Sequence, residues 1–175
     1  MKAATPYFKR RARNWRVERF RVYALASRPG RSRLAGDLRT DTLPLMHLGY
    51  AIIYVPDVGA SLAFFENAFG LQRRFLNDSG TYGELETGAT ALAFASHALG
   101  AANLPHGYVR ASESPMPLGM EIALVTADVH DAHRRALQHG AAEVQAPAAK
   151  PWGQIVSYVR APDGCLVELC SPMQG

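Results

Sequence analysis

In residues 46–175, stretches with apolar residues typical of strands alternate with stretches where apolar residues recur at helical spacing. This pattern predicts strands and helices in a fixed order. The apolar stretch 50–55 (YAIIYV) has the length of a strand. After it, Leu62, Phe65 and Phe69 recur at helical spacing, and Gly70 follows where a helix would end. Three short strands separated by turn residues are then predicted, over 71–77, 81–87 and 90–96.

The same order returns further along the chain, which indicates a duplicated unit. Residues 121–129 (EIALVTADV) align with residues 50–58 (YAIIYVPDV), and in each case an apolar strand ends in Asp-Val. Asp57 and Asp128 are therefore placed as helix N-caps. Three more strands are predicted over 142–145, 154–160 and 165–170. The prediction is an α+β fold of two β-α-β-β-β modules in tandem, whose mixed sheets form a concave cleft.

Strand alternation places two carboxylates on the open face of the second sheet. Successive side chains of a strand point to opposite faces, so Ile122 and Val167 pack on the helix while Glu121 and Glu168 line the open, largely apolar side. Because an unpaired buried charge is costly, these carboxylates should be paired, protonated or bound to a metal ion. The residues leave the choice open, since Arg160, Lys150, backbone donors or solvent could also neutralise them. Glu84 and Glu86 are interpreted as part of a solvated face.

Charge divides the chain into two parts. Residues 1–45 hold 12 of the 19 basic residues and 3 of the 15 acidic ones, a net charge of +9, which leaves −5 for residues 46–175. We expect residues 1–45 to be a flexible basic extension and residues 46–175 to be the folded domain. Three interpretations of the extension stay open: translation that starts at Met46, a tail without a role, or an arm for nucleic acid or an anionic membrane.

Apolar runs and cysteines indicate in which compartment the protein is expected. No apolar run approaches the ~20 residues of a membrane-spanning helix, and the five-residue run 22–26 is too short for a secretory signal. Cys165 and Cys170 are too close in an extended strand to bond each other, so we expect reduced thiols. We therefore expect a cytoplasmic protein with a small-molecule ligand, with no membrane partner and no specific nucleic-acid partner.

The motifs resemble those of the vicinal oxygen chelate superfamily, which comprises glyoxalase I, bleomycin and fosfomycin resistance proteins and extradiol dioxygenases. The resemblance lies in Tyr50-x4-Val55-x-Asp57-x3-Ser61-x2-Phe64-Phe65-x3-Phe69-Gly70-Leu71 and in Asp163-Gly164-x3-Glu168-Leu169. It covers about Met46 to Met173 and implies a first module over about 46–97, a join over 98–118 and a second module over about 119–173. It also implies a homodimer.

The resemblance implies that up to four residues in the cleft hold a divalent metal ion. The matching positions are Tyr50, Glu121, Glu168 and a position near Leu92 or Ala93, which cannot ligate. Zn, Ni, Mn or Fe would therefore need a third ligand besides Glu121 and Glu168, and the candidates are Tyr50, His97 and His106. The three histidines of the second predicted helix are interpreted as surface residues: His130, His133 and His139.

Two functions follow from the resemblance. The first, which we favour at this point, is a metal-assisted lyase, isomerase or dioxygenase-like enzyme that acts on a small oxygen-rich substrate, with Glu121 and Glu168 as catalytic residues. The alternative is a metal-free protein that sequesters a small molecule, as bleomycin resistance proteins do. The residues expected to contact the substrate or ligand are Tyr50, Tyr54, Phe94, Trp152, Gln154 and Arg160.

Overall fold

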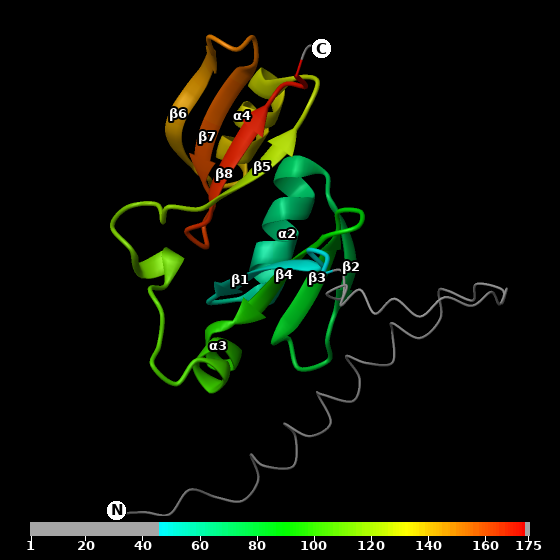
Figure 1. The fold of residues 1–175 in the computed structure, drawn as a ribbon, viewed down its shortest axis with the longest axis vertical. Coiled ribbons are helices and arrows are strands. Elements are labelled where there is room, and N and C mark those ends of the chain that lie inside the picture. Colours follow the sequence, from blue (N-terminus) through cyan, green and yellow to red (C-terminus); the bar gives the residue numbers. More distant parts are fainter. Residues whose placement is uncertain (1–45, 174–175) are drawn as a thin grey trace, which may run out of the picture. The chain divides into compact units, whose positions relative to one another are not determined.

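The predicted β-α-β-β-β order occurs twice in the computed structural model, which describes residues 46–173 (Figure 1). The expected basic extension, residues 1–45, lies outside the described residues. The first module consists of β1 (Tyr50–Val55), α2 (Val58–Phe69), β2 (Gln72–Leu76), β3 (Tyr82–Glu86) and β4 (Ala91–Ser96). The second consists of β5 (Glu121–Val125), α4 (Val129–Gln138), β6 (Ala142–Ala149), β7 (Ile155–Arg160) and β8 (Leu166–Cys170).

Each module forms one four-stranded mixed sheet, and the two sheets have equivalent strand orders. The first has the order β1-β4-β3-β2 and the second β5-β8-β7-β6. In both, the first and last strands of the module pair in parallel, and the other neighbours are antiparallel. The α+β class and the tandem modules predicted from the sequence are confirmed.

Both module helices begin at the predicted caps. The carboxylate of Asp57 accepts a hydrogen bond from the backbone of Ala60, and that of Asp128 accepts one from Asp131. Helix α2 ends at Gly70, whose φ of 71° is left-handed and open to glycine without strain. These local signals fix where each helix lies on its sheet, and with it the face of the sheet that stays open.

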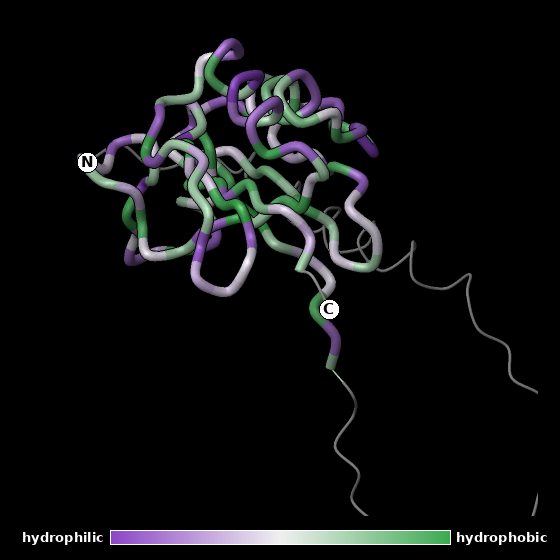
Figure 2. Tube along the Cα trace, turned by 90° about the horizontal axis from the view of Figure 1, so that it is seen from above, coloured by the Kyte–Doolittle hydropathy of each residue, from purple (hydrophilic) through white to green (hydrophobic). Residues whose placement is uncertain are grey.

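The core lies between each sheet and its helix, and the two helices join the modules. Helices α2 and α4 contact each other, and a single cluster of buried side chains draws on both modules. Ile53 and Val55 belong to it from β1, and Val167 and Leu169 from β8, as the alternation predicts. In Figure 2, many hydrophobic stretches (green) lie toward the inside of the described part, and many hydrophilic ones (purple) lie toward its outside.

The join between the modules contains a helix that the sequence pattern did not indicate. Helix α3 (His97–Asn103) is capped by the Ser96 hydroxyl and is followed by a loop with a short 3-10 helix, Ala111–Glu113. Seven residues with a central Gly100 give too weak a helical pattern to be recognised. Strand β6 is also longer than predicted: it continues from Gln145 to Ala149, with irregular pairing to β7.

Two smaller expectations can be compared with the structure. Cys165 and Cys170 are both free, as expected, and both are buried. Among residues 46–173, no helix is long and apolar enough to cross a membrane.

Candidate functional site

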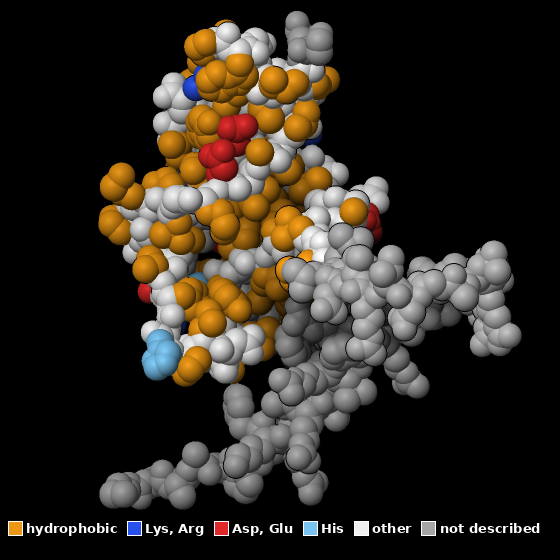
Figure 3. Space-filling model, in the orientation of Figure 1, with side chains coloured by type: hydrophobic (Ala, Val, Ile, Leu, Met, Phe, Trp, Pro, Cys, Tyr) orange, Lys and Arg blue, Asp and Glu red, His pale blue; other side chains and the backbone are white. Residues whose placement is uncertain are grey.

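The two predicted carboxylates lie side by side on the open face of the second sheet. Glu168 on β8 is registered with Ala123, two residues after Glu121 on the adjacent parallel strand β5. The two side chains lie on the same face of adjacent strands, close enough that, besides desolvation, the charge of Glu168 raises the pKa of Glu121. Figure 3 shows a small acidic patch (red) over β5 and β8, surrounded by hydrophobic side chains (orange).

Tyr158 on β7 orients this acid pair, which we define as Glu121 and Glu168. Its hydroxyl donates a 2.7 Å hydrogen bond to Oε2 of Glu168, its cross-strand neighbour. This bond, together with burial, raises the pKa of Tyr158 to about 12, so the phenol stays a donor at neutral pH. Desolvation and then the adjacent Glu168 raise the pKa of the Glu121 carboxyl above its ordinary value.

None of the basic side chains among the described residues forms an ion pair with the acid pair. Five of the seven are arginines bound to other carboxylates: Arg73, Arg74, Arg110, Arg134 and Arg135. The other two are Lys150 and Arg160. The Lys150 ammonium lies 5.8 Å from the centre of the Tyr158 ring, a cation–π contact beside the site. The acid pair therefore keeps its negative charge available to a ligand.

Arg160 does not neutralise the glutamates, although this was one of the open possibilities. Its Nη2 donates to the backbone oxygens of Ala111 at 2.6 Å and Ser114 at 2.7 Å. Its Nε lies 3.4 Å from the oxygen of Gly164. The side chain therefore holds the join against the second module, and its role as a substrate contact stays a prediction.

The first sheet carries its own acidic residue, which the interpretation as a solvated face missed. Glu84 on β3 is buried, and its carboxylate binds Arg74 at 3.0 Å and the Tyr82 hydroxyl at 2.9 Å. Arg74 also binds Glu86 at 2.7 Å. The missed signal is Arg74 on the neighbouring strand β2, because strand pairing brings it beside both acids. Here the charge is neutralised within the sheet.

Of the aromatic residues predicted to face a ligand, two lie on the open face of the first sheet and one does not. Tyr50 and Tyr54 are half-buried on β1, and Tyr54 packs on Tyr108 of the join with ring centres 4.9 Å apart. Phe94 is fully buried and packs on Phe65 of α2 at 5.1 Å. The prediction for Phe94 is wrong because its strand register with Ile53 turns it toward the helix.

The loop between β6 and β7 uses its polar groups internally. The indole of Trp152 donates to Oε1 of Gln154 at 2.9 Å, and Nε2 of Gln154 donates to the backbone oxygen of Ser171 at 2.7 Å. Trp152 itself is more than half exposed. Gln154 thus fixes the loop to the chain after β8, while the Trp152 ring stays accessible.

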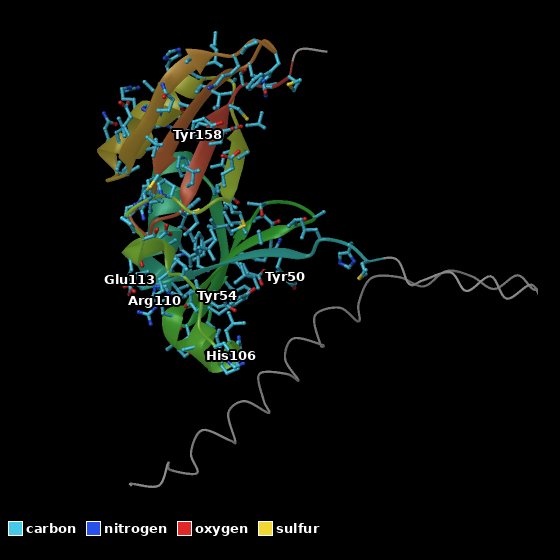
Figure 4. The ribbon with its side chains drawn as sticks, turned by 60° about the vertical axis from the view of Figure 1, so that its left-hand side comes forward. Tyr50, Tyr54, His106, Arg110, Glu113 and Tyr158 are labelled. Atoms are coloured by element: carbon cyan, nitrogen blue, oxygen red, sulfur yellow. The ribbon has the colours of Figure 1, made fainter. Side chains whose placement is uncertain are left out.

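The histidines proposed to complete a metal site do not lie beside the acid pair in one chain. Both ring nitrogens of His97 are engaged, Nδ1 with the Tyr108 hydroxyl at 2.8 Å and Nε2 with the Ser112 hydroxyl at 3.4 Å. Desolvation lowers the pKa of His97. His106 lies in the join and is exposed, and Figure 4 shows it well away from Tyr158.

The donor set in this chain does not fit a resident divalent ion. Within residues 46–173, no three His, Cys, Asp or Glu side chains come close enough to share one. Structural and catalytic sites for zinc or nickel take three or more protein ligands, and the acid pair supplies two. His133 gives no further ligand. It is buried on α4, not on the surface as expected, and bonds Glu143 at 2.9 Å.

This fold is that of one known superfamily. Residues 47–169 match the model of the Glyoxalase/Bleomycin resistance protein/Dioxygenase superfamily, so the chain belongs to that superfamily. Members of this class typically dimerise, bind small molecules and often hold a divalent metal ion.

Solved structures agree on the fold. A glyoxalase-related enzyme from Fulvimarina pelagi is 20% identical, with a TM-score of 0.62 over 73% of this chain and 89% of that one. A glyoxalase/bleomycin resistance protein/dioxygenase family enzyme from Burkholderia phytofirmans PsJN is 18% identical, with a TM-score of 0.61 over 72% and 98%. A superfamily member from Sphaerobacter thermophilus DSM 20745 is 23% identical, with a TM-score of 0.54 over 74% and 100%. None of the curated proteins matches the sequence.

Proposed function

We propose that this chain is a metal-independent binding protein that captures a small organic cation at the acid pair. The observation that carries the proposal is the placement of Glu121 against Glu168 on an open sheet face, with no cationic side chain paired to either among residues 46–173. An ammonium or guanidinium group donates hydrogen bonds that two adjacent carboxylates accept.

Surroundings of the acid pair strengthen the attraction for a cation. Tyr158 directs its hydroxyl to one oxygen of Glu168, which fixes the carboxylate and leaves its other oxygen for a ligand. Hydrophobic side chains surround the acid pair on this face (Figure 3), and charge-assisted hydrogen bonds are stronger where fewer water molecules compete. The negative charge of residues 46–175 also favours the approach of cations.

A titration with phenethylammonium, an arylalkyl ammonium ion, tests this proposal. Full-length protein treated with a chelator and dialysed should show saturable shifts of amide resonances in β5 and β8. Glu168→Gln should weaken the affinity by about tenfold or more. Asp78→Asn is the matched control, because it removes one negative charge in an exposed turn away from the acid pair and should leave the affinity unchanged. Shifts that do not saturate, or equal affinity in both variants, would overturn the proposal.

The metal-assisted enzyme remains the alternative function, because the acid pair occupies two positions that are ligands in enzymatic members. Under that alternative a second copy of the chain would have to supply the missing ligands, in a homodimer. Elemental analysis of the chelator-free protein, followed by titration with Ni, Zn, Mn and Fe, separates the two functions. About one bound equivalent that is lost in Glu168→Gln would favour the enzyme and count against the binding protein.

A further inference from the structure

A small apolar cavity lies next to the acid pair, between the open face of β1 and the join. It has a volume of about 150 Å³. Ile52 and Tyr54 line it from β1, and Leu166 lines it from β8. The join contributes Tyr108, Val109, Ala111 and Leu118, and the rest of the lining comes from Ile53, Met120, Gly164 and Cys165.

Several contacts build the walls of this cavity. Tyr108 stacks on Tyr54, and its hydroxyl is held by Nδ1 of His97 at 2.8 Å. A Cβ at position 100 would come within 2.6 Å of the Tyr108 hydroxyl oxygen, so only glycine leaves room for that ring. On the other side, Arg160 binds the backbone of Ala111, which packs against the turn before β8. The wall formed by the join is therefore fixed at both ends.

The cavity reaches the acid pair through two of its lining residues. Met120 directly precedes Glu121, and Leu166 is the strand partner of Glu121. Paired strands lie roughly 5 Å apart, and two residues along a strand span roughly 7 Å, which brings Glu168 within the same reach. A short alkyl linker would therefore let one ligand place a ring in the cavity and a cation at the carboxylates.

We propose that the cavity receives the apolar ring of the ligand, so that the ligand class is an arylalkyl ammonium ion. This inference rests on the proposed cation binding at the acid pair. An apolar cavity of about 150 Å³ accommodates a benzene-sized group, and the size here matches. The charge of the ligand is set by the acid pair, and its apolar part by the aliphatic and aromatic lining. Burial of the ring should tighten binding by about tenfold relative to the cation alone.

Three probes divide the proposal into its parts: ethylammonium carries only the cation, phenethyl alcohol only the ring, and phenethylammonium both. We expect phenethylammonium to bind about tenfold or more tightly than either of the others. Contacts in nuclear Overhauser spectra should connect its ring protons to the Ile52 methyl groups and to the Tyr108 ring. Full-length protein is used throughout.

The second part of the test uses variants whose larger side chains fill the cavity. Ile52→Trp should remove the gain due to the ring while ethylammonium still binds, and Leu166→Phe is a second variant in case the first does not fold. Val144→Trp is the matched control, because Val144 is exposed on β6 and does not line the cavity. Circular dichroism confirms that each variant is folded.

The outcomes distinguish this inference from the function on which it rests. If ethylammonium and phenethylammonium bind equally and both depend on Glu168, cation binding stands and the cavity assignment is overturned. If the gain due to the ring persists in Ile52→Trp and Leu166→Phe, the ring lies elsewhere and the assignment is again overturned. If no cation binds at all, both proposals fail. If phenethylammonium loses its advantage over ethylammonium in Ile52→Trp and Leu166→Phe but keeps it in Val144→Trp, the assignment of the ring to the cavity is supported.

Discussion

Both modules place an acid beside a phenol within their last two strands, and they use the acid in opposite ways. In the second module the acid Glu168 is on the last strand, and its cross-strand neighbour is Tyr158. In the first module the last strand carries Ala93 at the equivalent position, and its neighbour is the acid Glu84. Glu84 is buried against Arg74, whereas the acid pair of the second module has no arginine.

This difference teaches that one topology supports two uses of a carboxylate. The Arg74–Glu84 contact stabilises a sheet face, because the charge is neutralised where it is buried. The acid pair instead destabilises its own face, since two carboxylates share a small volume and one is desolvated. Groups that reduce stability yet are kept at a surface are typical of functional sites. Four experiments test this contrast, in order of decreasing effect.

The turns before the last strands of the two modules should respond very differently to the same substitution. Gly88 and Gly164 both have a left-handed backbone, but a Cβ at 164 would overlap the backbone of Ala111, whereas one at 88 meets nothing. Gly164→Ala should therefore lower the free energy of unfolding by about 3 kcal/mol, and Gly88→Ala by about 1 kcal/mol. Urea unfolding measures both, and equal losses would show that the join does not pack on this turn.

Removal of the arginine should expose the difference between buried and surface ion pairs in the first module. Arg74→Met leaves the buried Glu84 without its cation and should lower the free energy of unfolding by about 2 kcal/mol. Arg73→Met breaks a more exposed pair with Glu66 and should lower it by less than about 1 kcal/mol. Urea unfolding of both variants at low salt provides the comparison. If Arg74→Met were as stable as the wild type, the claim that the first module uses its buried carboxylate to stabilise the sheet would be wrong.

Glu121→Gln should stabilise the fold while it weakens cation binding. The folded-state pKa of Glu121 is raised, so ionisation at neutral pH disfavours the native state, and the penalty fades as the pH falls toward the unfolded-state value. The variant should melt about one to two degrees higher at neutral pH, with a smaller gain at mildly acidic pH. Thermal unfolding by circular dichroism measures the gain. Glu66→Gln, which loses a bridge to Arg73, should show none; a drop for Glu121→Gln at neutral pH would contradict the account.

The smallest effect is expected at Lys150, which lies over the Tyr158 ring without a hydrogen bond or ion pair to the acid pair. Its positive charge opposes a cationic ligand nearby, so Lys150→Met should tighten phenethylammonium binding by about twofold. The same change should make the affinity more sensitive to salt, because the site becomes more negative. Weaker binding in Lys150→Met would mean that this lysine contacts the ligand or supports Tyr158.

Local patterns in the sequence predicted most of the fold, because each module is built from strands and capped helices with strong signals. The alternation in β1 and the aspartate caps are examples in which nearby residues decide the structure. Phe94 was misplaced because β4 reads Ala-Leu-Ala-Phe-Ala-Ser and has no charged residue to mark its open face. Its orientation is decided by the pairing with β1, which involves residues far away in the sequence.

The sequence predicted the placement of the acid pair, but it did not predict the contacts of the nearby Arg160 and of His97. Glu121 and Glu168 follow from strand parity and the duplicated order, which are properties of the sequence. The long side chain of Arg160 could have reached several acceptors, and it reaches the backbone of the join, which is 46 and 49 residues away along the chain. His97 likewise bonds Tyr108 within the join. Such contacts depend on the path of a loop, which carries few local signals.

The most direct test of cation binding at the acid pair is a calorimetric titration of metal-stripped protein with phenethylammonium in two buffers that differ in protonation enthalpy. At mildly acidic pH the account predicts that binding releases protons, because a cation beside Glu121 favours its ionised form and lowers its raised pKa. The release should vanish in Glu121→Gln. Binding that releases no protons in the wild type, or that requires added metal, would contradict the account.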